Sequence, residues 1–146
     1  MLVLSIVTRR LKEGKTYEDF RKLWYHTVGF GTPSKLYSAI NAFDQREVIV
    51  VGFVEVGPGQ DPAKLLGIDV KERLDHSLDA VIEPEIGRTY GIVVSEDDFS
   101  STGKMEFRPA AVNGKRTDFT EVAQALVLAR QLFTQAATER AKSRKQ

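Results

Sequence analysis

The chain has 146 residues, 42% of them hydrophobic and 28% charged, which is typical of one globular domain with a sizeable core. A net charge of +1 argues against a nucleic-acid binder, and the absence of cysteine excludes disulfides, thiolate metal sites and cysteine nucleophiles. The apolar start is too short for a secretory signal, and no segment reaches the about 20 apolar residues of a membrane span. We therefore expect a cytoplasmic protein with no nucleic-acid or membrane partner.

The first half of the chain predicts a strand, a helix and a β-hairpin. Residues 2–8 form a strand that is apolar on both sides. Thr16 begins a helix with a capping-box signal, and the apolar residues of this helix recur at helical spacing up to Val28. Residues 35–43 form a second strand, and the short polar link at 44–46 forces the next strand to pair with it antiparallel.

The third strand, Glu47–Val56, is the longest β-branched run in the chain and is apolar on both sides. On the side of Gly52, we expect Trp24 of the first helix to fill the room that the glycine leaves. The opposite side carries three large apolar residues, Ile49, Val51 and Phe53. Leaving these three in water would forgo about 5–9 kcal/mol. Either the C-terminal helix or a second chain must cover them, and we favour a homodimer whose sheets pack face to face through these residues.

The second half of the chain begins with a helix and a fourth strand. Asp61 and Pro62 start the helix, which we expect to be broken or kinked near Gly67 and to end at Pro84. Residues 88–95 form the fourth strand. The buried stripe of the helix is predicted to comprise Val70, Leu74, Ser77, Leu78 and Val81.

The order β-α-β-β-α-β predicts a ferredoxin-like α+β fold, an antiparallel sheet with two helices on one face. This domain takes up residues 1–95, and residues 96–116 form an irregular connection. Residues 117–146 form a C-terminal helical extension with a basic tail. One side of that last helix carries Phe119, Val122, Ala123, Leu126, Ala129, Phe133 and Ala136.

A chain of this order with a sheet apolar on both faces resembles the dimeric α/β-barrel superfamily. That group includes antibiotic-biosynthesis-monooxygenase-like, ether-degradation-type and stress-responsive barrel proteins. The run Phe20–His26, with Trp24 four residues after Phe20, resembles the aromatic helix of the group, although Val28 stands where the ether-degradation type has a histidine. Over residues 2–95 the resemblance implies a homodimer, a small-molecule pocket between helices and sheet, and oxygen chemistry without a cofactor.

Two residues are candidates for catalysis. A cofactor-independent monooxygenase acting on a phenol or quinol needs a base for the substrate and donors for the resulting anion. His26 or Tyr37 could be the base, with Asn41 as a donor. However, helical rotation points His26 toward solvent, which favours a plain surface histidine. The two histidines of the chain lack the paired spacing of metal ligands, so we expect no metal site.

Three further residues are candidates for ligand binding. Trp24 could stack on a small apolar or aromatic ligand, or belong to the core. Asn41 shares one face of the second strand with Tyr37, which suits either a pocket wall or a wet interface, and Tyr90 is equally ambiguous. A cavity among these residues and His26 would indicate an enzyme or a non-catalytic ligand-binding or regulatory module. A filled core would indicate a structural dimer module.

Overall fold

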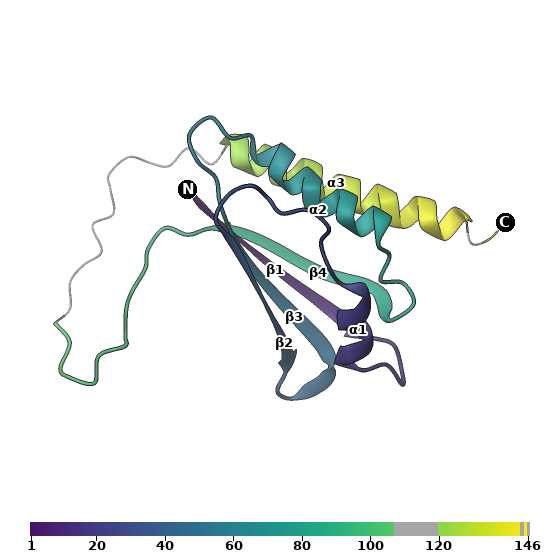
Figure 1. Cartoon of the computed structure of the whole chain (residues 1–146), viewed down its shortest axis with the longest axis horizontal. Coiled ribbons are helices and arrows are strands. Elements are labelled where there is room, and N and C mark those ends of the chain that lie inside the picture. Colours follow the sequence, from purple (N-terminus) through teal and green to yellow (C-terminus); the bar gives the residue numbers. More distant parts are fainter. Residues whose placement is uncertain (107–119, 144, 146) are drawn as a thin grey trace.

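The computed structural model describes residues 1–106, 120–143 and 145. Their elements, in chain order, are β1 (Leu2–Leu11), α1 (Tyr17–Leu23), β2 (Ser34–Asn41), β3 (Asp44–Glu55), α2 (Pro62–Asp75), β4 (Ile82–Ile92) and α3 (Thr120–Ser143). The described strands form one four-stranded antiparallel sheet in the order β2-β3-β1-β4 (Figure 1). The α+β class and the antiparallel β2–β3 hairpin are as predicted, and the arrangement is consistent with a ferredoxin-like fold.

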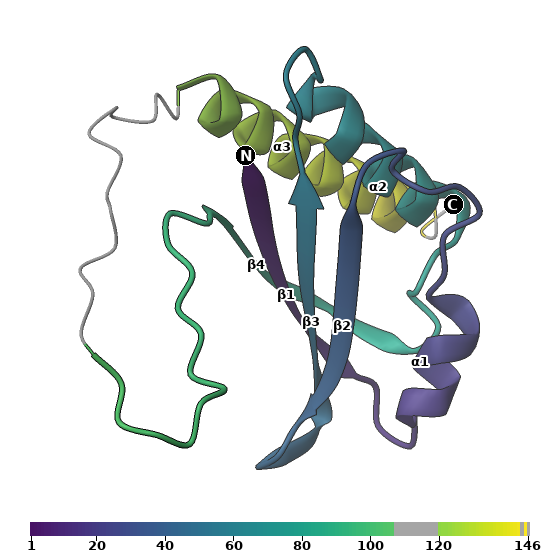
Figure 2. The ribbon, with the colours of Figure 1, turned by 60° about the vertical axis from the view of Figure 1, so that its left-hand side comes forward.

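The helices lie on one side of the sheet. In Figure 1 they lie above and to the right of the strands, and α3 runs beside α2, as Figure 2 also shows. The C-terminal helix therefore does not fold back over the side of Ile49, Val51 and Phe53, which was one of the two predicted covers. The apolar stripe predicted for α3 lies on side chains outside the described residues.

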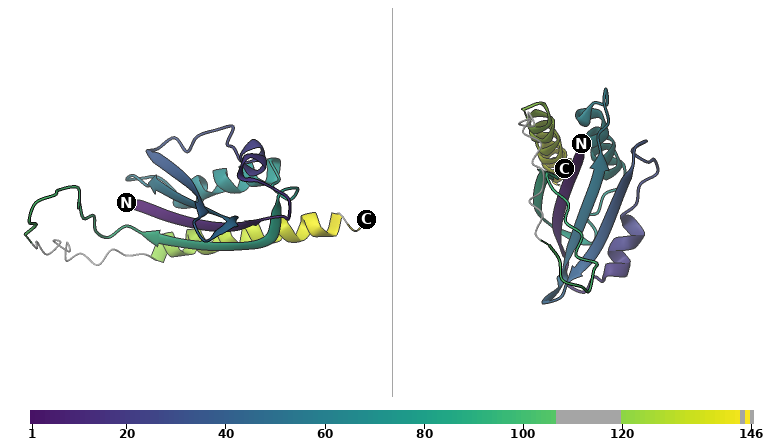
Figure 3. Two further views of the ribbon diagram at one scale, coloured as in Figure 1. Left: turned by 90° about the horizontal axis from the view of Figure 1, so that it is seen from below. Right: turned by 90° about the vertical axis from the view of Figure 1, so that its left-hand side faces the viewer.

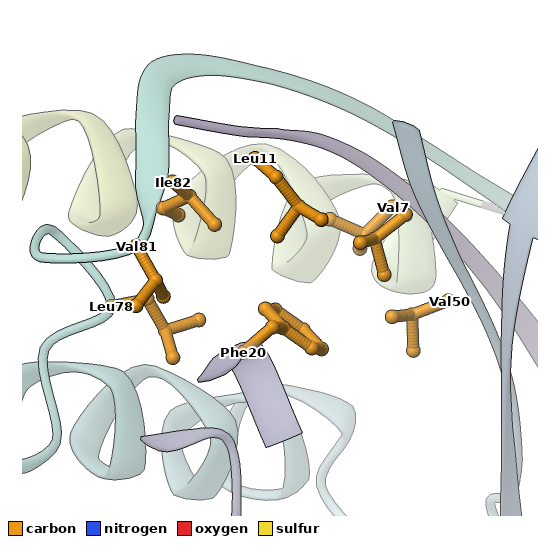
Figure 4. Close-up of a cluster of buried hydrophobic side chains, with 8 residues drawn as sticks. Val7, Leu11, Phe20, Val50, Leu78, Val81 and Ile82 are labelled. Atoms are coloured by element: carbon orange, nitrogen blue, oxygen red, sulfur yellow. The ribbon is translucent and has the colours of Figure 1, made fainter. Parts of the chain in front are cut away.

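One face of the sheet packs against α1 and the segment that follows α2. Phe20 of α1 is completely buried and points into a cluster of apolar side chains from β1, β3, β4 and the α2–β4 connection (Figure 4). This cluster comprises Val7, Leu11, Val48, Val50, Leu78, Val81 and Ile82. It lies at the end of the sheet near α1, so the part of the same face beneath α2 has to be filled by other side chains.

The other face of the sheet carries no helix of the described residues. Register places Leu4 beside Phe53 and Ile6 beside Val51, and Tyr37 lies beside Val51 on the far side. These apolar side chains remain partly or largely exposed. We call this surface the open face and define it by Leu4, Ile6, Tyr37, Ile49, Val51 and Phe53.

Helix α1 is shorter than predicted, because it ends at Leu23 rather than near Val28. Trp24 caps it with an extended backbone conformation, and the chain then crosses to α2. The backbone groups that leave the helix bond to α2 side chains instead, since Arg73 donates to the Tyr25 carbonyl and Glu72 accepts from the Thr27 N–H. Contacts with α2 have thus replaced the helical hydrogen bonds that the apolar spacing predicted for residues 24–28.

The N-terminus of α1 is a capping box, as predicted. The Thr16 hydroxyl accepts from the Asp19 N–H, and the Asp19 carboxylate accepts from the Thr16 N–H at 2.9 Å. Replacing Thr16 with alanine is expected to lower the free energy of unfolding by about 0.5–2 kcal/mol. Urea denaturation measures the change, and the exposed Thr138→Ala variant on α3 serves as the control, in which no loss of stability is expected. Equal midpoints for the two variants would show that the cap contributes nothing.

Five further expectations about the elements were wrong. The β2–β3 hairpin turns at residues 42–43, before the predicted polar link. Helix α2 runs through Gly67 without a break and ends at Asp75, and Leu74 on its predicted buried stripe is exposed. Strand β4 starts at Ile82 and contains Pro84, which an edge strand tolerates near the irregularity in its pairing with β1.

Candidate functional site

A cavity of about 70 Å³ lies between the inner face of the sheet and helix α2. Its walls are mostly apolar and include Val3, Val50, Val54 and Leu65. Two aromatic residues that flank the segment after α1, Trp24 and Phe30, also line it, as does Tyr90 of β4. The cavity therefore lies on the side of the sheet that carries Gly52.

Gly52 forms part of the floor of this cavity. A Cβ atom added there would lie 3.3 Å from Cγ of Leu36 and 3.9 Å from Cβ of Ser5. The atoms nearest to it belong to Leu36 and Ser5 rather than to Trp24, so the predicted filling of this room by Trp24 is wrong. Gly52 instead keeps side-chain volume out of the cavity, which explains a glycine in the middle of a strand.

Four charged or polar side chains of α2 face the segment of residues 24–30. Asp69, Glu72, Arg73 and His76 recur at intervals of three and four residues, which places them on one face of the helix. Each of them contacts a residue between Tyr25 and Thr27. The segment that carries two of the aromatic walls of the cavity is therefore held in place by polar contacts with α2.

Asp69 joins the segment to the cavity. Its Oδ1 lies 3.1 Å from Nε2 of His26, and its Oδ2 lies 3.7 Å from the guanidinium of Arg88 on β4. Burial alone would raise the pKa of Asp69, but the hydrogen bond with His26 and the charges of Arg88 and Arg73 hold that pKa below its ordinary value. Asp69 is therefore a carboxylate at neutral pH, and it lines the cavity.

Glu72 is buried and binds Thr27 twice. It accepts from the Thr27 hydroxyl at 2.7 Å and from the Thr27 N–H at 2.8 Å, and these bonds lower the pKa of Glu72. One turn later on α2, Nδ1 of His76 lies 3.1 Å from the Tyr25 hydroxyl. None of these four residues lines the cavity, and their contacts hold the backbone of residues 24–30 in place.

Arg73 is buried between the segment and the cavity. It donates to the Tyr25 carbonyl, and its guanidinium carbon lies 5.6 Å from the centre of the Trp24 ring. Burial lowers the pKa of Arg73, and the carboxylates of Asp69 and Glu72 oppose that shift. An arginine remains protonated across the physiological range, so Arg73 brings a positive charge to the cavity wall.

Acid is expected to release the segment from α2. The pKa values of Asp69 and Glu72 are lower in the folded than in the unfolded chain, where carboxyl groups titrate near about 4. Their contribution to stability is therefore complete above that pH and is lost as the pH falls through the lowered values. Trp24 emission, followed from pH 7 to pH 2, should change below about pH 4.

Removing one hydrogen bond to Glu72 tests this assignment. The Thr27→Val variant loses the hydroxyl donor but keeps the backbone donor, so its acid transition should move to higher pH. The exposed Thr102→Ala variant should keep the transition of the parent chain. An identical transition in all three proteins would contradict the role of Glu72.

The structure brings together three of the five predicted site residues. Trp24 and Tyr90 line the cavity, as expected for ligand-binding residues. The side chain of His26 is only 16% exposed, so the prediction of a plain surface histidine is wrong. Its ring contacts those of Trp24 and Phe30 and bonds Asp69, but His26 itself is not among the residues that line the cavity.

Tyr37 and Asn41 lie on the opposite side of the sheet. Tyr37 is 58% exposed and meets the ring of Phe53 edge-on in the open face. The Asn41 side chain donates to Glu47 and accepts from the Phe43 N–H at the hairpin. Because the sheet separates them from the cavity, these two residues do not share a pocket with Trp24, and the cavity does not extend to all five candidate residues.

The charged residues of the cavity wall were missed. Arg9, Asp69, Arg73 and Arg88 all line it. The sequence contains signals for three of them. Arg9 points to the same side of its strand as Val3 and Val7, and Asp69 and Arg73 are four residues apart, which places them on one face of a helix. Only the folded sheet shows that these separate positions converge on one cavity.

Within residues 1–106, 120–143 and 145, no three histidine, aspartate or glutamate side chains are placed to hold a metal ion. No helix among the same residues has the length and apolar character needed to cross a membrane. Comparisons of the chain with protein-family models, with curated proteins and with solved structures find no match.

Proposed function

We propose that the protein binds a small apolar anion, a carboxylate or a phenolate, in the cavity between its sheet and α2. The observation that carries this proposal is the make-up of the wall. Apolar and aromatic side chains surround the space, and three arginines, Arg9, Arg73 and Arg88, belong to the same wall. Ligand pockets commonly combine apolar walls with a few polar groups that orient the ligand.

The arginines favour an anionic ligand. A guanidinium group offers five N–H donors in a planar fork that matches a carboxylate, and its hydrogen bonds to an anion are strong in a partly buried site. Asp69 is the one carboxylate among the lining residues, and its negative charge offsets part of the positive charge of the three arginines. The aromatic rings of Trp24, Phe30 and Tyr90 offer faces and edges against which an apolar or aromatic body can pack.

The volume limits the size of the ligand. A cavity needs about 10–15 Å³ to hold one water molecule, so this cavity of about 70 Å³ has room for about five water molecules. A branched short-chain acid fits such a space. A single aromatic ring needs more room, since an apolar cavity known to bind benzene measures about 150 Å³. Leu36, which lines the cavity and is exposed, is the side chain that can move aside.

The placement of the candidate bases favours binding over catalysis. A general base has to reach the proton that it removes, directly or through one water molecule. His26 does not line the cavity, and Asp69, which does, has a lowered pKa and is a weak base. Cofactor-independent oxygen chemistry on a phenol or quinol is the second proposal. It is supported by the position of the cavity between helix and sheet, and oxygen uptake with a quinol tests it.

Trp24 supplies the assay, because it is the single tryptophan of the chain and lines the cavity. We expect benzoate and isobutyrate to change its fluorescence saturably. The neutral isostere benzyl alcohol should bind about tenfold more weakly or worse than benzoate, because it lacks a charged partner for arginine. Equal affinities for benzoate and benzyl alcohol would contradict the proposal of an anion site.

Two arginine variants localise the effect. The Arg88→Gln variant should weaken benzoate binding, since Arg88 lines the cavity. Arg21 is the control, because its guanidinium lies over the Trp24 ring at 5.3 Å, as that of Arg73 does at 5.6 Å, but Arg21 is exposed and does not line the cavity. The Arg21→Gln variant should therefore bind benzoate like the parent chain.

We also propose that two copies of the chain pair through their open faces. The centre of this face is apolar, and charges of both signs flank it, with Arg10 beside Glu47 at one end and Lys35 and Glu55 near the other. A twofold interface needs a self-complementary surface of this kind. Burial of the apolar centre would stabilise the pair. Complete transfer of Ile49, Val51 and Phe53 from water to an apolar interface corresponds to about 5–9 kcal/mol.

A further inference from the structure

The chain leaves its own fold after β4. The last backbone hydrogen bond with the sheet joins the Val93 N–H to the Leu2 carbonyl at 2.9 Å. Every residue from 94 to 106 is exposed. Figures 1 and 3 show this segment standing away from the strands on the side where β4 ends. We call residues 94–106 the arm.

The arm is not a purely polar linker. Val94 and Phe99 are each 77% exposed, and Met105 is exposed as well. Local bonds shape two turns within it, in which Ser100 N–H donates to Asp98 and Gly103 N–H donates to Ser101. Large apolar side chains that stay exposed on a segment leaving the sheet are typical of a surface that another molecule covers.

We propose that the arm of one chain packs on a second copy of the same chain, along the β2 edge of its open face. This inference rests on the proposed homodimer and goes beyond it, since it assigns residues outside the sheet to the interface. The arm leaves the sheet at Val93, which bonds to the first residue of β1. A second copy seated on the open face would lie beside the point at which the arm leaves the sheet.

Strand β2 suits the arm in three ways. Among the described strands it is an edge strand and pairs with β3 alone, so its outer backbone groups can accept another strand. Tyr37 and Ala39 are exposed on its open-face side and offer an apolar contact for Phe99. The arm carries Glu96, Asp97 and Asp98 in a row, which complement the exposed Lys35 of β2.

The absence of cysteine in the chain allows a direct test by cross-linking. One sample carries Thr102→Cys in the arm and a second, isotope-labelled sample carries Ala39→Cys on β2. After the two are mixed, a short bis-maleimide should join one labelled to one unlabelled chain. Glu18→Cys on α1, also exposed, replaces Ala39→Cys in the control and should give little cross-linked product.

Sedimentation of the parent chain separates the possible failures. The parent chain could be a dimer while cysteines at positions 102 and 39 cross-link no more than cysteines at positions 102 and 18. In that case the arm does not pack on β2 of the partner, and the proposal of a dimer through the open faces is unaffected. A link between positions 102 and 39 within one doubly substituted chain would also contradict the proposed packing of the arm. A monomer at all concentrations would overturn both the dimer and the arm, while benzoate binding reported by Trp24 would remain a separate result.

A second variant measures the contribution of the arm. Replacing Phe99 with serine should raise the dimer dissociation constant about tenfold, because a buried aromatic residue is a typical interface anchor. Since Phe99 is 77% exposed in the single chain, its loss should leave the melting temperature of the monomeric fraction unchanged. An unchanged dimer constant would refute a role for Phe99.

Discussion

Replacing Phe53 with lysine is expected to convert the proposed dimer into a monomer. Phe53 lies near the C-terminal end of β3 on the open face, beside Leu4 and Lys35. In a twofold interface the substitution places two ammonium groups in an apolar contact, and burying an unpaired charge is far costlier than losing one apolar contact. We expect the dissociation constant to rise at least about 100-fold, which corresponds to about 2.7 kcal/mol. Sedimentation equilibrium measures it.

Phe43 provides the matched control for this variant. It is also a phenylalanine next to β3, but it lies at the tip of the hairpin, is 99% exposed and is not part of the open face. The Phe43→Lys variant should therefore keep the dissociation constant of the parent chain. If Phe53→Lys and Phe43→Lys behave alike, the dimer does not form through the open face.

Replacing Gly52 with valine is expected to abolish ligand binding. The new side chain would occupy the floor of the cavity, and its Cβ would lie 3.3 Å from Cγ of Leu36. Overpacking of this kind typically costs about 1–3 kcal/mol of stability, because Leu36 has to shift. The fold should survive that cost, whereas the Trp24 response to benzoate should disappear. Fluorescence titration and thermal unfolding measure the two effects on the same sample.

Gly91 serves as the control for this substitution. It is a strand glycine that pairs with Leu4, so it lies on the other side of the sheet, and an added Cβ would be 4.0 Å from Leu4. The Gly91→Val variant should retain benzoate binding. Undiminished binding by a folded Gly52→Val protein would exclude the cavity as the ligand site.

Much of the sheet could be predicted because its signals are local. A run such as Glu47–Val56, rich in β-branched residues and apolar on both sides, has few alternatives to a central strand. The capping box of Thr16 and Asp19 is likewise a short-range signal, and the structure confirms it. Side-chain parity also placed Gly52 and Ile49 on opposite faces of the sheet, as observed.

The site was harder to predict because its contacts are long-range. His26 was assigned to solvent from a helix that in fact ends at Leu23, and the extended chain beyond that point turns His26 toward Asp69. No local pattern announces that Arg73 will satisfy a carbonyl of residue 25 rather than face water. Conversely, parity on the second strand grouped Tyr37 and Asn41 correctly, but the side to which they point could be known only from the folded sheet.

Methyl NMR spectra recorded with increasing benzoate test the central claim most directly. Val50 and Val54 line the cavity, whereas Val51, between them in sequence, lies on the open face. We predict saturable shifts at Val50 and Val54 and little change at Val51, with the same concentration dependence as Trp24 fluorescence. Shifts confined to Val51, or no shifts at all at saturating benzoate, would contradict the assignment of the cavity as the ligand site.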